Sequence, residues 1–219
     1  MKESLANLKK AARELYLMEH IQATVSWDQE TQMPDAGNSE RAEQLALLEG
    51  MMHQKLTSPE IGRLLSVVGA DDSKPEGKGD FEIEDKAFIR EMYRNYKRAS
   101  RLPESLVTEM ARQTGLAHAS WATARKNSDF SLFEDNLAKI VELCREKAEK
   151  IGYDEHPYDA LLDEYEPYMT ASQVENVFGP LGKKLSELTA AIAASKQVDT
   201  SFTERKYPVR LQDEFGRAV

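Results

Sequence analysis

Apolar residues recur at steps of three and four positions along most of this chain. Such spacing places them on one face of an α-helix, because a helix completes a turn every 3.6 residues. The first predicted helix carries the apolar face Leu5, Leu8, Ala12, Leu15, Met18, Ile21 and Val25. Pro34 is predicted to end this helix, since proline lacks the amide that a continuing helix needs.

Capping residues and helix breakers divide the remaining sequence into further helices. A second helix is predicted from Asn38 or Ser39, either of which suits the N-cap, to about Leu56. A capping box at residues 57–60 predicts the start of a third helix, which should end at Gly69. A second capping box at residues 131–134 predicts the start of a sixth helix, which should end at Gly152. The remaining helix starts are predicted at Asp80, Leu102-Pro103, Pro157, Thr170 and after Pro208. Gly179-Pro180 is expected to kink the helix that begins at Thr170. The last helix carries the apolar stripe Leu211, Phe215 and Val219.

The predicted fold class is all-α, a multi-helix array of long amphipathic helices with no significant sheet. No run alternates apolar and polar residues, and no Asn-Gly or Asp-Gly pair marks a hairpin. We treat residues 1–219 as one helical region, in which residues 70–80, rich in charge, Gly and Pro, are predicted to be a mobile loop. The last apolar stripe reaches Val219 without a capping residue, so we expect a truncated chain that stops inside a helix.

Composition and charge narrow the classes of function. The chain has 29 basic and 38 acidic residues and a net charge of -9, which disfavours a nucleic-acid partner. Lys9, Lys10 and Arg13 interrupt any amino-terminal signal, and the longest uncharged apolar run, 188–195, is too short to cross a membrane. A single cysteine, Cys144, is typical of a reducing compartment, so we expect a cytoplasmic protein with no membrane partner.

Local spacing predicts no metal site and no catalytic residue. A zinc peptidase site needs H-E-x-x-H, in which two imidazoles one turn apart hold the metal and the Glu activates water. The four histidines are His20, His53, His118 and His156, and no two of them are close in sequence. There is also no Glu-x-x-His pair of the kind found in di-iron bundles.

Two segments contain acidic residues that an ordinary amphipathic helix would not favour at these positions. Residues 26–34, Ser-Trp-Asp-Gln-Glu-Thr-Gln-Met-Pro, place acids near a helix carboxyl end, where the helix dipole disfavours them, so other groups should hold them. Within residues 158–167, Asp159 and Asp163 share one helix face, which requires cations or donors opposite. Two interpretations stay open for these acids: capping and salt bridging to arginines of neighbouring helices, or a role in a site.

A basic stripe with interleaved tyrosines also stands out, at Arg90, Arg94, Lys97 and Arg101. We interpret it as a solvated helix face whose cations suit the carboxyl end of the helix, because the chain as a whole is acidic.

In the two segments above, the sequence resembles the carboxypeptidase Taq family, also known as thermostable carboxypeptidases. The longest matching words are Trp27-Asp28-Gln29-Glu30-Thr31 with Met33-Pro34, and Tyr158-Asp159-Ala160-Leu161-Leu162-Asp163 with Tyr165-Glu166-Pro167 and Met169-Thr170. Shorter words follow the same order at 41–53, 60–65, 102–103, 121–125 and 152–153, so the similarity runs from about residue 15 to about residue 190. At Tyr168 the family usually has Gly, which bears on the turn there because Tyr tolerates positive φ poorly.

The resemblance implies a helical metallopeptidase, usually homodimeric, that removes single residues from the carboxyl ends of peptide substrates. In the family, the first half forms one wall and the rim of a deep groove. The second half supplies the H-E-x-x-H helix, a further Glu ligand and the residues that hold the substrate carboxylate. This chain resembles the first half, so zinc or cobalt is expected only in the full-length protein, and the chain alone is expected to bind no metal and to be inactive.

The resemblance also makes six residues candidates for lining the groove or for supporting the missing half: Trp27, Asp28, Tyr158, Asp159, Tyr165 and Glu166. Apolar helix faces that the missing half would cover are expected to drive self-association. The alternative is a stand-alone, non-catalytic helical interaction or scaffold protein. A reading frame that continues into H-E-x-x-H would favour the peptidase, and a natural stop at Val219 would favour the scaffold.

Overall fold

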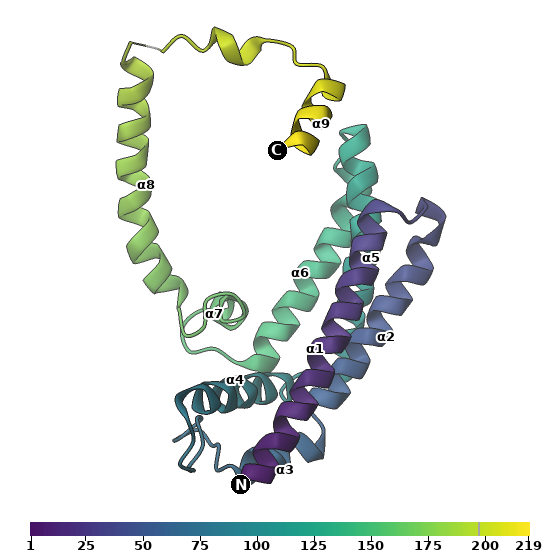
Figure 1. Ribbon diagram of the computed structural model, residues 1–219, viewed down its shortest axis with the longest axis vertical. Coiled ribbons are helices and arrows are strands. Elements are labelled where there is room, and N and C mark those ends of the chain that lie inside the picture. The colour runs from purple at the N-terminus through teal and green to yellow at the C-terminus, as the bar shows by residue number, and fades with distance from the viewer. Residues whose placement is uncertain (197) are drawn as a thin grey trace. The chain divides into compact units, whose positions relative to one another are not determined.

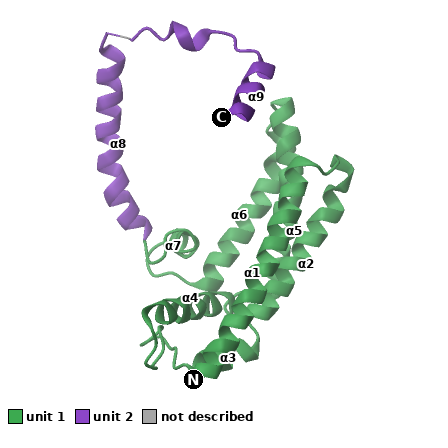
Figure 2. Ribbon diagram, viewed as in Figure 1, with its two compact units in different colours: residues 1–169 green, residues 170–219 purple. Residues whose placement is uncertain are grey.

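The computed structural model describes residues 1–196 and 198–219, and nearly all of its regular elements are helices (Figure 1). Within these ranges the one pairing of extended backbone is an isolated bridge between Asp71 and Lys74, so the predicted all-α fold class is confirmed. The chain forms two compact units, Met1–Met169 and Thr170–Val219 (Figure 2). In the described ranges, no helix combines the length and the hydropathy that a membrane crossing requires.

Four long helices of the first unit pack against one another in order. They are α1 (Lys2–Thr31), α2 (Asn38–Leu56), α5 (Glu104–Asn127) and α6 (Ser131–Ile151), with α1 against α2, α2 against α5, and α5 against α6. Small residues let α2 and α5 approach closely. A Cβ atom added to Gly115 would lie 3.2 Å from the Cα of Ala42, and one added to Gly50 would lie 2.9 Å from Cγ2 of Thr108. Larger side chains at these glycines would push the two helices apart.

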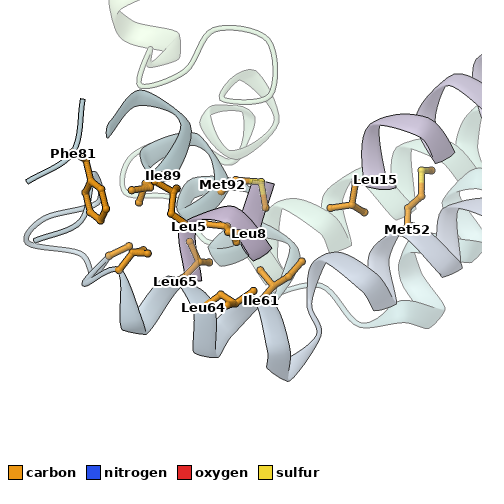
Figure 3. Close-up of a cluster of buried hydrophobic side chains, with 12 residues drawn as sticks. Leu5, Leu8, Leu15, Met52, Ile61, Leu64, Leu65, Phe81, Ile89 and Met92 are labelled. Carbon is orange, nitrogen blue, oxygen red and sulfur yellow. The ribbon is translucent and has the colours of Figure 1, made fainter. Parts of the chain in front are cut away.

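The main apolar core lies where the amino-terminal part of α1 meets α3 (Pro59–Val67) and α4 (Ile83–Ala99) (Figure 3). Leu8 and Ile89 are fully buried there, and Leu64 is buried beside them. A smaller cluster of Ala148, Ile151 and Ala160 joins the end of α6 to the short helix α7 (Pro157–Leu162). Packing between distant helices therefore holds α3, α4 and α7, since short helices are marginal alone in water.

The predicted apolar face of the first helix is only partly right. Leu5, Leu8 and Leu15 belong to the core, but Ile21 is 55% exposed. The core is therefore confined to the first half of α1. The second half of this helix borders the cavity described below.

Several helix ends have the predicted chemistry. Ser58 accepts a hydrogen bond from the amide of Ile61 at the start of α3, and Pro59 occupies the first turn. Thr170 forms a capping box with Gln173 at the start of α8 (Ala171–Ala194). Gly152, at φ 80, ends α6 as predicted.

Other predicted caps are wrong, and in each case a neighbouring residue occupies the N-cap position. Gly37, at the end of a short 3-10 turn η1 (Asp35–Gly37), is the N-cap of α2, so Asn38 and Ser39 lie inside the helix. The helix α4 begins at Ile83 after Glu82, not at Asp80. The N-cap of α3 is Ser58, so the third helical position is Ile61 and the capping box that needed Glu60 is not formed. At the start of α6, the amide and hydroxyl of Ser131 both donate to Asp129, so the box at 131–134 is also wrong.

Residues 70–80, predicted to be a mobile loop, form an irregular turn held by polar contacts. Oδ1 of Asp71 accepts hydrogen bonds from the amides of Ser73 and Lys74 at 3.0 and 2.9 Å, and Oδ2 pairs with the ammonium of Lys78 at 2.5 Å. Lys78 first, and then the hydroxyl of Ser73, hold the pKa of Asp71 well below its ordinary value. Mobility of this segment stays a prediction, which hydrogen exchange of its amides can test.

The second unit contains α8, a 3-10 turn η2 (Ser201–Glu204) and α9 (Val209–Ala218). The helix α8 continues through Pro180, so the expected kink does not interrupt it, and α9 follows Pro208 as predicted. None of the described residues of these elements is buried. One face of α8 carries exposed apolar residues at steps of three and four, here named the α8 stripe: Phe178, Leu181, Leu185, Leu188 and Ile192.

The first prediction concerns the core. Leu8→Ala is expected to lower the free energy of unfolding by about 2–5 kcal/mol, because the helices around a fully buried leucine cannot close the space that it leaves. Leu47→Ala is the matched control, since Leu47 is 65% exposed and its loss should change stability by no more than about 0.5 kcal/mol. Urea unfolding followed by circular dichroism measures both values. Equal losses in the two variants would contradict this placement of the core.

Candidate functional site

A cavity of about 890 Å³ opens within the first unit. Its walls come from α1, α2, α4 and α5, with Lys147 and Ile151 of α6 and Glu164 just after α7. The polar and charged residues that line it are Tyr16, Glu19, Gln22, Ser26, Gln29, Glu30, Glu49, His53, Arg94, Asn95, Arg98, Thr114, His118, Lys147 and Glu164. The size is in the range of small-molecule and peptide sites, and the mixed lining can bind both polar and apolar groups.

Hydrogen bonds between helices fix several of these side chains. Gln22 of α1 donates to Glu49 of α2 at 2.9 Å, and Gln29 of α1 donates to the carbonyl of Gly115 in α5 at 3.2 Å. Nε2 of His53 lies 3.1 Å from the carbonyl of Ala99, at the end of α4. The acids of the lining come mainly from α1 and α2, and the cations come from α4 and α6. The two sides of the cavity therefore differ in charge.

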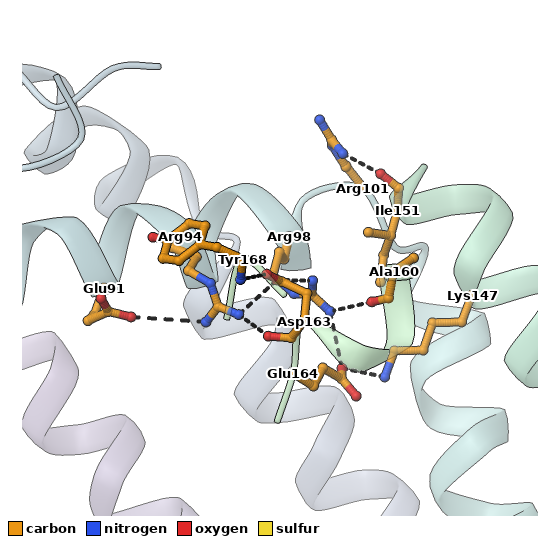
Figure 4. Close-up of polar contacts among 10 residues, drawn as sticks. All are labelled: Glu91, Arg94, Arg98, Arg101, Lys147, Ile151, Ala160, Asp163, Glu164 and Tyr168. Atoms are coloured by element: carbon orange, nitrogen blue, oxygen red, sulfur yellow. Dashed lines mark hydrogen bonds and ion pairs between the residues drawn. The ribbon is translucent and has the colours of Figure 1, made fainter. Parts of the chain in front are cut away.

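A polar cluster beside the cavity centres on the carboxylate of Asp163, just after α7 (Figure 4). Its Oδ2 pairs with Nη2 of Arg94 at 2.7 Å and also accepts from Arg98. The side chain of Arg94 is 15% exposed and that of Asp163 is 22% exposed, so solvent screens this pair only in part. The cluster ties α4 to the residues after α7.

The same carboxylate also holds a turn. Oδ1 of Asp163 accepts a hydrogen bond from the amide of Tyr168 at 2.9 Å (Figure 4). Tyr168 has a φ of 70, and its ring lies 5.8 Å from the guanidinium carbon of Arg94. A tyrosine therefore adopts a positive φ here, and the cluster contacts both its backbone and its ring.

Further contacts extend the cluster to α6. Glu164 pairs with Lys147 of α6 at 2.5 Å and lies 3.6 Å from Arg98. Arg98 also donates to the carbonyl of Ala160 at 3.1 Å, and Arg101 donates to the carbonyl of Ile151. These contacts bind carboxylate and carbonyl groups at or near the ends of α6 and α7.

The basic stripe of α4 is thus only in part the solvated face that the sequence suggested. Arg90 is exposed, whereas Arg94 and Arg101 bind groups of the residues after α7 and of α6, and Lys97 pairs with Asp72. Arg98 was not predicted to belong to this basic stripe, although it follows Arg94 by four residues and therefore shares its helix face. Of the two interpretations left open for Asp163, salt bridging to arginines is correct.

Burial and pairing act on the pKa of Asp163 in opposite directions. Burial would raise it, but the amide of Tyr168 and the guanidinium groups of Arg94 and Arg98 outweigh this effect, so the pKa lies below its ordinary value of 3.8. The carboxylate is therefore held in its charged form.

The six candidate residues do not line the cavity. Asp28 pairs with Arg41 of α2 at 2.6 Å, which supplies the partner that an acid near a helix carboxyl end was expected to need. Trp27 is 58% exposed on α1 beside it. Tyr158, Tyr165 and Glu166 are also exposed, and Asp159 is half-buried in α7. The structure thus separates these residues from the cavity and brings Asp28 together with Arg41.

In the part of the chain that the structure describes, the side chains do not form a set of ligands that fits a metal ion. No group of three or more His, Cys, Asp and Glu side chains there is arranged to hold a metal ion. His53 and His118 both line the cavity, but His118 lies 5.9 Å, ring to ring, from Trp121 and His53 faces the carbonyl of Ala99. The described residues can bind and orient a ligand through hydrogen bonds and charge, and no metal-dependent step is assigned to them.

The second prediction concerns the pH dependence of the Asp163 cluster. Because the folded-state pKa is depressed, the ionised carboxylate stabilises the fold above about pH 4, and this contribution is lost as the pH falls toward the folded-state pKa. Asp163→Asn is expected to lower the free energy of unfolding by about 2–4 kcal/mol at pH 7, since it leaves two partly buried arginines without an anion. The difference from the unmodified chain should shrink at about pH 3.

Urea unfolding at both pH values measures this difference, and Glu43→Gln, at an exposed position on α2, is the control. A loss for Asp163→Asn that is the same at both pH values would contradict the assignment of the stabilising contact to the ionised form.

Comparison with known proteins identifies the family. The profile of carboxypeptidase Taq (M32) metallopeptidases matches residues 7–219. Thermostable carboxypeptidase 1 of Thermus thermophilus is 34% identical over 96% of this chain and 42% of its own length. The solved structure of BsuCP superposes with a TM-score of 0.87 at 27% identity, over 97% of this chain and 42% of that one. The Pyrococcus furiosus carboxypeptidase structure, named as an apo-Mg form, gives a TM-score of 0.71 at 32% identity over 89% of this chain and 38% of that one.

Two conclusions follow from these matches. The chain spans about two fifths of the length of the relatives that it matches. The resemblance found at 27–34 and 158–170 is confirmed over nearly the whole sequence, and the chain belongs to the carboxypeptidase Taq (M32) family of metallopeptidases.

Proposed function

We propose that this chain is the amino-terminal helical part of a metal-dependent carboxypeptidase that removes single residues from the carboxyl ends of peptides. The observation that carries the proposal is the family match over residues 7–219, combined with coverage of only 42% of a relative named as a carboxypeptidase. The metal, zinc or cobalt, would supply activation of water and of the scissile carbonyl. Its ligands would come from the portion of the family fold that this chain does not span.

The cavity would contribute one wall of the substrate groove. A peptide presents alternating amide donors and carbonyl acceptors, and the cavity offers amide, imidazole and carboxylate groups, such as those of Gln29, His53 and Glu30, that can face them. Its apolar lining residues, among them Leu45, Met52 and Met110, can receive apolar side chains. Gln22 and Gln29 are held by neighbouring helices, so their positions are set before any substrate binds.

The six candidate residues take the supporting role in this proposal. They lie outside the cavity lining, and four of them, Trp27, Tyr158, Tyr165 and Glu166, are exposed. Exposed aromatic residues of this kind suit contact with another part of the fold. The single Cys144 supports a cytoplasmic location.

The third prediction tests the function through a chimera. Residues 1–219 replace the matched portion of the Thermus thermophilus relative, and release of the terminal residue from a blocked dipeptide is measured with zinc or cobalt. The chimera is expected to be active only with metal, and residues 1–219 alone are expected to show no metal-dependent release. Activity of residues 1–219 alone would refute the placement of the catalytic groups, and a folded but inactive chimera would favour the scaffold alternative.

The fourth prediction concerns self-association. The family resemblance also implies self-association, because members of the family are usually homodimers. The α8 stripe presents five exposed apolar residues on one helix face, so we expect residues 1–219 to associate through it. Leu185→Glu places a charge in the middle of the stripe and should shift the molar mass from light scattering toward the monomer. Leu47→Glu, which adds the same charge at an exposed leucine of α2, should leave the mass unchanged. A monodisperse monomer of the unmodified chain would contradict the prediction.

A further inference from the structure

Arg94 of α4 uses only part of its capacity to donate hydrogen bonds. Its Nη2 donates to the backbone carbonyl and, at 2.7 Å, to the carboxylate of Asp163 (Figure 4). Its Nη1 lies 4.0 Å from Glu91, whose other oxygen lies 3.2 Å from Nε of Arg90. Among the described residues, Nε of Arg94 is the one buried side-chain nitrogen or oxygen without a hydrogen-bond partner. Within the described chain, two nitrogens of this guanidinium therefore have no acceptor at hydrogen-bonding distance.

Arg94 lines the cavity, and so does the next residue of its helix, Asn95. The side chain of Arg94 is 15% exposed, and Asn95 is exposed. A guanidinium only donates hydrogen bonds, and a side-chain amide can donate two. The wall of the cavity at α4 therefore presents donors for a ligand that carries acceptor oxygens.

Positive charge exceeds negative charge on the side of the cavity formed by α4 and α6. Three cations line this side, Arg94, Arg98 and Lys147, and they share two carboxylates. Asp163 pairs with both arginines, whereas Glu164 pairs with Lys147 at 2.5 Å and lies 3.6 Å from Arg98. The acids on the other side of the cavity come from α1 and α2. An anionic group that enters the cavity is therefore attracted toward α4 and repelled from α1 and α2.

We propose that Arg94 and Asn95 form a subsite for the side-chain carboxylate of an Asp or Glu residue in a bound peptide. The inference rests on the proposed function, in which the cavity contributes one wall of the substrate groove. Both oxygens of a carboxylate accept hydrogen bonds, so one carboxylate can bind Nη1 of Arg94 and the amide of Asn95 together. The terminal carboxylate of the substrate is a separate group, because the family resemblance assigns it to the second half of the fold.

The charge of the whole chain makes this preference diagnostic. The net charge is -9, so the chain as a whole repels an acidic peptide. An acidic peptide that binds more tightly than its neutral counterpart must therefore owe the difference to cations near the place where it binds.

Calorimetric titration of residues 1–219 at low ionic strength, where screening is weakest, tests the proposal. Short acetylated alanine peptides are compared: an amide with a central Glu, the same amide with a central Gln, and the Gln peptide with a free terminal carboxylate. The Glu amide is expected to bind at least about tenfold more tightly than the Gln amide, because it adds a hydrogen bond between charged groups. The free terminal carboxylate should not improve binding of the Gln peptide.

Two variants of the subsite and one matched control locate the preference. Asn95→Asp places a carboxylate on the same wall, where it competes for Arg94, and should abolish the preference for Glu. Arg94→Lys keeps a cation near Asp163 but removes the unpaired nitrogens, and should also abolish it. Arg90→Gln makes the same change of net charge at an exposed position of α4 outside the cavity lining, and should preserve it.

Circular dichroism checks that each variant folds. Asn95 is exposed, so Asn95→Asp should melt within about 3 °C of the unmodified chain. The comparison of Asn95→Asp with Arg90→Gln therefore decides the outcome even if Arg94→Lys does not fold.

Several results would overturn the proposal. The Glu and Gln amides could bind equally or not at all, or the preference for Glu could survive Asn95→Asp or be lost to the same extent in Arg90→Gln. A Gln peptide with a free carboxylate that binds as tightly as the Glu amide would assign the subsite to the terminal carboxylate instead. None of these measurements involves hydrolysis. A metal-dependent, active chimera without the preference for Glu would therefore refute the subsite and leave the proposed function intact.

Discussion

The carboxylate of Asp163 is the contact on which the position of the residues after α7 depends. One oxygen binds two arginines of α4, and the other binds the amide of Tyr168. The helix α7 packs against the end of α6 through Ala160, whereas none of the residues 163–169 that follow it is buried. Charge-assisted hydrogen bonds in a partly buried site contribute more than surface ion pairs, since solvent screens them less. The position of the segment after α7 is therefore set by electrostatics more than by hydrophobic contact.

Sequence periodicity predicted most helices because helix formation depends on residues within one or two turns. The ends of α2 and α6 and the start of α8 at Thr170 were predicted from this local information and are confirmed. The cap at Ser131 was wrong for a local reason, since Asp129 lies two residues before it and accepts from its amide and hydroxyl, whereas α4 begins three residues after Asp80 with no side-chain cap. Periodicity could not predict the pairing of Arg94 with Asp163, because 69 residues separate them and only the packing of α4 against the residues after α7 brings them together.

The residues that line the cavity could not be predicted from local sequence patterns either. Its lining joins residues from Ala12 to Glu164, and no sequence word marks them as a set. A zinc motif is different, because H-E-x-x-H places its ligands on adjacent helical turns and is therefore visible in a short window. The six candidate residues came from long matching words and lie outside the cavity, whereas Gln29 and Glu30 of the first word line it, so such words mark contacts of the fold as well as the cavity. The pairing of Asp28 with Arg41 is one such contact.

Tyr168 shows how contacts with one polar cluster can offset the cost of a strained backbone conformation. A non-glycine residue in the left-handed region costs about 1–2 kcal/mol. An exposed cation–π contact returns about 0.5–1 kcal/mol, and a hydrogen bond to a charged group about 1.5–3 kcal/mol. The sum favours the observed conformation by only a small margin, and most of that margin comes from one hydrogen bond to Asp163. The hydrogen bond to Asp163 therefore accounts for most of the stability of this turn conformation.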